Sequence, residues 1–131
     1  MKTLNIIKKS KVISILDKYN ASITRLIAER VIPCGNFVET GNYSLFDKYC
    51  EKIDKSNAKL NRIVGFVRSI HYIFSRLDDV SKTIIINEYL DKKVDYWWDD
   101  KYSCSTYRRK KIIAIDKFLT FAEAINLDFE I

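Results

Sequence analysis

Glycine, proline and long apolar runs are all scarce in this sequence. The 131 residues include three glycines and one proline, and β-rich proteins depend on these residue types for their many turns. The scarcity favours long helices with short connections, although the many Ile, Val, Tyr and Phe residues also suit strands. No apolar run approaches the roughly 20 residues that span a bilayer, and no segment resembles a signal peptide. We therefore expect an all-α fold in the cytoplasm, without membrane contact.

The few cysteines and the single histidine argue against metal sites and catalysis. Cys34, Cys50 and Cys104 are odd in number and form no Cys-x-x-Cys pair, so we expect reduced thiols rather than disulfides or zinc ligands. His71 lies among apolar residues of a predicted helix, which indicates a core or surface residue. The sequence has no glycine-rich phosphate loop, Ser-His-Asp set or paired-carboxylate spacing. We therefore predict no enzymatic activity, no metal and no cofactor.

Positive charge is concentrated near the end of the chain. The formal net charge is +6. Within residues 101–117 a single acid, Asp116, stands against the bases Lys101, Arg108, Arg109, Lys110, Lys111 and Lys117. Residues 118–131 contain no base at all. This distribution suits an anionic partner, although a basic charge alone does not establish one.

Apolar periodicity predicts helices along most of the chain. It indicates one helix over 3–19 and a second from Ser22, a plausible N-cap, to residue 31. Residues 32–43 contain the only proline and two glycines, which marks a linker. We therefore divide the chain into an N-terminal helical segment with its linker, 1–43, and a helical domain, 44–131.

The middle of the chain leaves two structural alternatives open. The apolar stripe over 44–77, which Ser44 could cap, forms either one long helix or two helices broken near 55–57. Ile84, Ile85 and Ile86 suit either a helix or a buried strand. We favour the helix, because Asp79 or Ser81 can cap it and no partner strand is evident.

A helix-turn-helix is predicted at about 94–125. Its first helix runs from about 91 or 94 to 100, and its second begins at the N-cap Ser103 and ends near 125. Trp97 and Trp98 would brace the pair. The second helix has small polar residues in its first turn, then cations, with an apolar face opposite. Such a helix can pack on a core and present its N-terminal half to a DNA major groove.

This region resembles a known family of regulators. It contains Tyr96-Trp97 followed by Tyr102-Ser103-x-Ser105-Thr106-Tyr107-x-Arg109-Lys110-Lys111-x-x-Ala114-x-x-x-Phe118. The pattern resembles the C-terminal signature of ArpU-type phage transcriptional regulators, which are themselves similar to region four of sigma-70 factors. The resemblance covers 80–122 and is looser over 44–79. Two residues depart from sigma-like motifs: Lys101 replaces the turn glycine, where a positive φ would be unfavourable, and Asp100 replaces a leucine.

The resemblance implies a sequence-specific, double-stranded DNA-binding transcriptional regulator of phage or prophage late genes. Cys104, Ser105, Arg108 and Arg109 would approach bases, with Tyr107 buried. The complete expected DNA-binding set is Lys101, Ser103, Cys104, Ser105, Thr106, Arg108, Arg109, Lys110, Lys111 and Lys117. RNA polymerase and a second copy of this chain are further candidate partners.

Two alternatives remain beside this interpretation. In the first, the basic run is only the solvated face of an ordinary helix. In the second, the protein is an oligomeric helical assembly or DNA-packaging adaptor that does not read promoters and that works through the 44–77 stripe. A stable ring or higher oligomer in solution would favour the second alternative.

Overall fold

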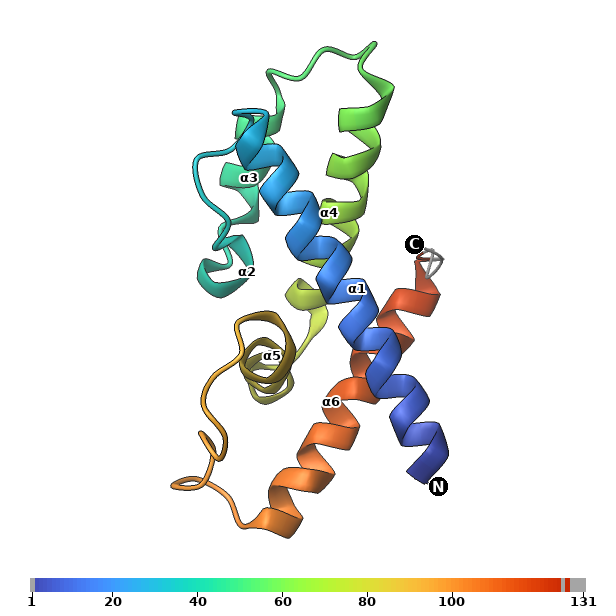
Figure 1. Cartoon of the computed structure of the whole chain (residues 1–131), viewed down its shortest axis with the longest axis vertical. Helices are drawn as coiled ribbons and strands as arrows, with labels where there is room; N and C mark the ends of the chain where they lie inside the picture. Colours follow the sequence, from blue (N-terminus) through green and yellow to red (C-terminus); the bar gives the residue numbers. More distant parts are fainter. Residues whose placement is uncertain (1, 126, 128–131) are drawn as a thin grey trace.

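The chain forms helices and no strands over the residues that the computed structural model describes, 2–125 and 127. In chain order these are α1 (Lys2–Ala28), α2 (Phe37–Thr40), α3 (Tyr43–Cys50), α4 (Ala58–Arg76), α5 (Asp79–Ile85), the π-helical η1 (Ile86–Leu90) and α6 (Cys104–Ala124). Figure 1 shows their arrangement. The predicted all-α class is confirmed. None of these helices is both long enough and apolar enough to cross a bilayer.

One continuous helix, α1, replaces the two that the sequence predicts over 3–19 and 22–31. Ser22 caps no new helix and is instead buried within α1. The prediction was wrong because neither Asn20 nor Ala21 stops a helix that packing already stabilises. α1 ends where Arg30 adopts a φ of 60° and the Val31 N–H donates to the Leu26 carbonyl at 2.9 Å. This is a left-handed C-terminal cap made without glycine.

Two helices, α3 and α4, occupy the 44–77 stripe, so the broken alternative is correct. Asn42 rather than Ser44 caps α3, because its side chain accepts from the Leu45 N–H at 3.3 Å. Asn57 likewise caps α4 and accepts from the Leu60 N–H at 3.1 Å. The apolar stripe of α4 is buried at Val64, Val67, Ile70, Ile73 and Phe74. It therefore belongs to the core and is not the exposed working surface that the assembly alternative requires.

The isoleucine run is helical, as favoured. Asp78, rather than Asp79 or Ser81, caps α5 and accepts from the Ser81 N–H at 3.1 Å. Ile84 and Ile85 are fully buried, and the chain then widens into the π-helical turn η1 before leaving helical structure at Asp91.

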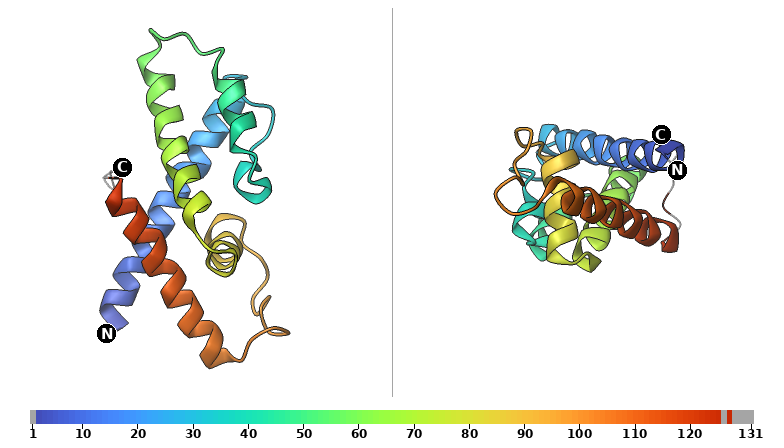
Figure 2. Two further views of the ribbon diagram at one scale, coloured as in Figure 1. Left: turned by 180° about the vertical axis from the view of Figure 1, so that it is seen from behind. Right: turned by 90° about the horizontal axis from the view of Figure 1, so that it is seen from below.

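The helices share one hydrophobic core. α1 crosses α4 and α6, and α5 packs against α6 (Figures 1 and 2). Buried apolar side chains form one cluster that extends from Val12 in α1 to Ala122 in α6. Segments 1–43 and 44–131 therefore contribute to the same core. The crossing leaves the N-terminal half of α6 at one extremity of the molecule, at the bottom of Figure 1.

Candidate nucleic-acid interface

The segment before α6 is not the predicted short helix. Residues 95–101 form successive turns, in which Lys101 and Tyr102 donate backbone N–H groups to the Trp98 carbonyl at 2.9 and 3.1 Å. Tyr96 has a φ of 61°, which a right-handed helix does not allow. Lys101 is not among the described residues with positive φ, so the unusual backbone falls at Tyr96 and not at the expected turn-glycine position. The prediction of a helix that ends at residue 100 was therefore wrong, and turns stand where the first helix of the helix-turn-helix was expected.

Aromatic packing explains the turns. Neighbouring residues of a helix point about 100° apart, so a helix could not easily place both tryptophans on one partner. In the structure both pack on Tyr107 of α6. Trp98 stacks on it with ring centroids 4.3 Å apart, and Trp97 meets it edge-on at 5.6 Å. The Tyr107 cluster, as we name it, consists of Tyr96, Trp97, Trp98, Tyr102 and Tyr107.

The Tyr107 cluster confirms that Tyr107 is buried, but the tryptophans brace α6 against turns and not against the short helix that the sequence predicts. Both tryptophans pack on Tyr107, which has 4% of its surface exposed. Trp97 adds a polar link, because its Nε1 donates to the Glu88 carboxylate of η1 at 3.2 Å. The irregular segment is thereby fastened to both η1 and α6, so that it can hold the start of α6 in place without being helical.

The start of α6 is formed as the sequence predicts. Ser103 is its N-cap, and its Oγ accepts from the Thr106 N–H at 3.2 Å. Ser103, Cys104 and Ser105 are exposed, and Thr106 is half-buried. The other N–H groups of this first turn have no intrahelical partner. Together with the helix dipole they favour an approaching anion.

The two arginines are exposed on the second turn of α6. Arg108 donates to Cys104 Sγ at 3.8 Å, and Arg109 donates to Thr106 Oγ1 at 3.5 Å. Both guanidinium groups therefore point back toward the start of the helix. Neither forms an ion pair within the described part of the chain. Their charges remain available to an external partner.

The four lysines of the predicted set differ from one another. Lys101 is exposed, and Lys110 is half-buried with its Nζ 5.4 Å from the centre of the Tyr102 ring. Lys111 pairs with Glu88 at 3.0 Å, and Lys117 pairs with Asp78 at 2.9 Å. The last two lysines thus tie α6 to η1 and to the cap of α5. Of the four, Lys101 and Lys110 are the better placed to contact phosphate.

Glu88 is a site residue that the sequence did not reveal. Burial raises the pKa of its carboxyl, but hydrogen bonds from Lys111, Trp97 and Tyr107 and the Lys111 charge outweigh this, and the pKa falls below its usual value. Glu88 therefore remains charged beside α6 and neutralises Lys111. The partners lie 23 positions apart in the chain, so no local spacing could have indicated the pair.

The single histidine lies in the core, one of the two locations that the sequence indicated. His71 is buried, its Nε2 is hydrogen-bonded to Tyr19 Oη at 2.9 Å, and its ring stacks on Tyr43 at 4.7 Å. Burial lowers its pKa to about 4. Within residues 2–125 and 127, no three His, Cys, Asp or Glu side chains gather as a metal site would require.

Comparisons with known proteins add no relative. No protein-family model, no curated protein and no solved structure matches the chain.

Proposed function

We propose that this protein binds double-stranded DNA through the N-terminal half of α6 and regulates transcription. The observation that carries the proposal is the pair Arg108 and Arg109. Both are exposed and form no ion pair with any residue that the structure describes, and they lie on a capped helix whose opposite face is anchored by buried Tyr107. An α-helix fits the major groove, and arginine is the side chain that most often reads guanine there.

The surroundings of the arginines support this docking. Ser103, Cys104 and Ser105 are small and exposed at the tip of α6, so the helix can approach base edges closely. Lys101 and Lys110 flank the tip and can contact phosphates. Since Lys111 and Lys117 already have carboxylate partners, we assign them no more than a secondary role.

Acidic side chains limit how DNA can approach. Asp95, Asp99 and Asp100 are exposed on the turns before α6, and phosphates repel them. The duplex would therefore approach the face of α6 that carries Arg108 and Arg109. The acidic turns would then lie at the border of the DNA contact. The finer assignment, to regulators of phage or prophage late genes that are similar to sigma region four, is supported by the pattern over 80–122. The irregular 95–101 segment makes this chain a divergent example.

The test is selection of bound sequences from a random duplex library, followed by affinity measurements on the selected site. Arg108→Ala and Arg109→Ala should each weaken binding by about 1–3 kcal/mol and relax specificity at one position. Lys110→Ala should weaken all sequences alike and reduce the salt slope by about one. Arg62→Ala is the matched control, because Arg62 is an exposed arginine of α4 that lies outside the site. Unchanged binding in all three site variants would end the proposal.

A second candidate function is an oligomeric assembly or DNA-packaging adaptor. One observation favours it: Leu4, Ile6 and Ile7 near the start of α1 are 45%, 63% and 48% exposed. Leu4 and Ile7 share one face of α1, and exposed apolar side chains that share a face often mark contacts between proteins. The mass in solution separates the candidates, because a stable ring favours the adaptor. A monomer or dimer that binds the selected duplex favours the regulator. A dimer would fit this function, because helix-turn-helix proteins often dimerise to read two half-sites.

A further inference from the structure

The five cations of α6 divide into two groups along the helix. Arg108, Arg109 and Lys110, in its first two turns, form no ion pair with any residue that the structure describes. The two cations that follow each have a carboxylate partner on another element, in the pairs Lys111–Glu88 at 3.0 Å and Lys117–Asp78 at 2.9 Å. The positive charge that is open to an external anion is therefore concentrated at the start of α6.

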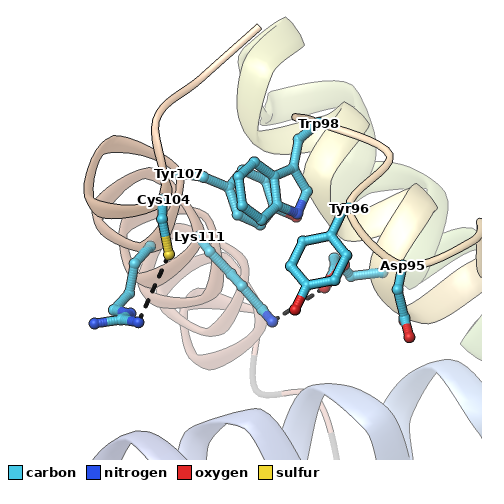
Figure 3. Close-up of a pocket in the computed structure, with 8 residues that line it drawn as sticks. Asp95, Tyr96, Trp98, Cys104, Tyr107 and Lys111 are labelled. Atoms are coloured by element: carbon cyan, nitrogen blue, oxygen red, sulfur yellow. Dashed lines mark hydrogen bonds and ion pairs between the residues drawn. The ribbon is translucent and has the colours of Figure 1, made fainter. Parts of the chain in front are cut away.

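Lys111 turns away from the start of the helix. It follows Arg108 by three positions, a spacing that makes two side chains neighbours on a helix surface. Both residues line a cavity of about 300 Å³, but their side chains diverge around it. In Figure 3 Lys111 points toward the side where Tyr96 and Asp95 lie, whereas Cys104, which accepts from Arg108, lies on the other side. The two cations therefore do not face a common anion.

Glu88 holds Lys111 more firmly than an exposed acid would. Its carboxylate also accepts from Trp97 Nε1 at 3.2 Å, so a second element fixes its position. Burial raises the pKa of Glu88, but hydrogen bonds from Lys111 and Trp97 and the Lys111 charge bring it below its usual value, and the carboxylate stays charged. The Lys111 and Glu88 side chains are 27% and 20% exposed, and salt screens such a partly buried pair less than an exposed one.

A lysine that is free to contact phosphate would change how DNA is bound. Phosphate contacts add affinity for every sequence and carry no sequence information directly. At a selected site Arg108 and Arg109 would fix α6 in one orientation. A random duplex could instead be bound in any orientation that brings a further cation onto a phosphate. An additional free lysine would therefore favour random DNA over the selected site.

We propose that Glu88 is a specificity-determining residue, which withholds Lys111 from phosphate and so confines the DNA contact to the first two turns of α6. The inference rests on the proposed function and assigns Glu88 a role in it. Asp78 withholds Lys117 in the same way but less firmly, because the Lys117 and Asp78 side chains are 48% and 45% exposed.

The experiment measures the affinity of the full chain for a selected duplex and for a random duplex over a range of salt concentrations. Glu88→Gln keeps an acceptor for Trp97 but releases Lys111. On the random duplex it should steepen the slope of log affinity against log salt by about 0.9 and strengthen binding about threefold at low salt. The selected duplex should gain less, so that the specificity ratio falls about twofold. A merely structural role would give the opposite sign, because a misplaced α6 would weaken the binding of both duplexes.

Two lysine variants test whether Lys111 causes the effect. Lys111→Met alone should leave the slope unchanged, because Glu88 already withholds this lysine. Combined with Glu88→Gln, it should return the slope to that of the unaltered protein. Asp78→Asn retains an acceptor for the Ser81 N–H and releases Lys117, so it should act in the same direction as Glu88→Gln and by no more than the same amount.

Glu29→Gln is the matched control. It removes the same charge and releases Arg25, its partner at 3.1 Å, near the end of α1 and far from the start of α6 (Figure 1). Its slope should stay close to that of the unaltered protein. Equal slopes in Glu88→Gln and Glu29→Gln, or a slope that Lys111→Met alone reduces, would overturn the inference.

Failure of the proposed function has a different signature. In that case no duplex would be selected, or Arg108→Ala and Arg109→Ala would leave duplex binding unchanged. Elution from heparin, a polyanion without bases, then tests the state of Lys111 apart from DNA. Glu88→Gln should elute at a higher salt concentration than Glu29→Gln, and elution of both at the same concentration would contradict the claim that Glu88 withholds Lys111.

Discussion

The two aromatic clusters of this protein differ in what surrounds them. The His71 cluster, as we name it, is enclosed by α1, α2, α3 and α4 and consists of Tyr19, Phe37, Tyr43, Phe46 and His71. Phe37 and Phe46 are 2% and 0% exposed there. The Tyr107 cluster is held by turns on one side and one helix on the other, and it includes Tyr96, which is 71% exposed.

Charge divides the clusters further. None of the five residues of the His71 cluster forms an ion pair within the described part of the chain. Burial lowers the pKa of its histidine to about 4. The Tyr107 cluster adjoins the Lys111–Glu88 pair, the exposed Arg108 and a cavity. Enclosure by helices therefore produces a core, whereas the open cluster anchors a helix and still leaves a ring and charged side chains exposed.

The largest difference should appear in stability. Phe46→Ala removes a fully buried ring and should lower the free energy of unfolding by about 3–5 kcal/mol. Tyr96→Ala removes an exposed ring and relaxes strained backbone only partly, so it should change stability by less than about 0.5 kcal/mol. Denaturant unfolding followed by circular dichroism measures both. Similar losses in the two variants would show that both clusters are ordinary core.

The next effect is a pH dependence of the His71 cluster. His71 stays neutral in the folded protein down to its pKa of about 4, while the unfolded chain protonates near 6.5. The unfolded state thus binds more protons between these values. Stability should be fully present above pH 6.5 and fall by up to about 3 kcal/mol on acidification to pH 4.

The control for this pH dependence is His71→Gln. It keeps a hydrogen-bonding side chain for Tyr19 but cannot titrate, so its stability should lack the decline between pH 6.5 and 4 that is specific to His71. A decline of the same size in His71→Gln would assign it to carboxylates instead.

The third prediction concerns the ion pairs of α6. Lys111 and Glu88 are 27% and 20% exposed, whereas Lys117 and Asp78 are 48% and 45% exposed. Water screens the second pair more strongly. A double-mutant cycle with Lys111→Met and Glu88→Gln should give a coupling of about 1–2 kcal/mol. The cycle with Lys117→Met and Asp78→Asn should give about 0.5 kcal/mol or less. The opposite order would mean that Lys111 is not fixed to η1 and is free for phosphate.

Much of the fold follows from the sequence because its signals are local. Apolar spacing and the scarcity of glycine and proline predicted helices, and Ser103 marked the start of α6 correctly. Helix ends were less predictable, since Asn42 and Asp78 cap where neighbouring Ser44, Asp79 and Ser81 also qualified. When several polar residues that could each cap a helix lie within two or three positions, no local signal shows which of them is the N-cap.

The candidate site was only partly predictable, for a related reason. The sequence predicted the exposed start of α6 and its two arginines, because both depend only on the N-cap and the apolar spacing of a single helix. The turns over 95–101 follow from Trp97 and Trp98 meeting Tyr107, a tertiary contact that overrides helical preference. The partners of Lys111 and Lys117 are also distant in the chain. Nothing in the sequence pattern could therefore distinguish these two paired lysines from the other cations of α6.

The smallest expected effect tests the acidic turns beside the Tyr107 cluster. Asp99 and Asp100 are exposed next to Lys101, and in the proposed complex they repel phosphate across solvent. Asp99→Asn with Asp100→Asn should therefore strengthen duplex binding about twofold to threefold at low salt, with less gain at physiological salt. Asp17→Asn with Asp54→Asn, away from the site, removes the same formal charge and serves as control. If both pairs strengthen binding equally, the gain reflects net charge alone, and the acidic turns do not border the DNA.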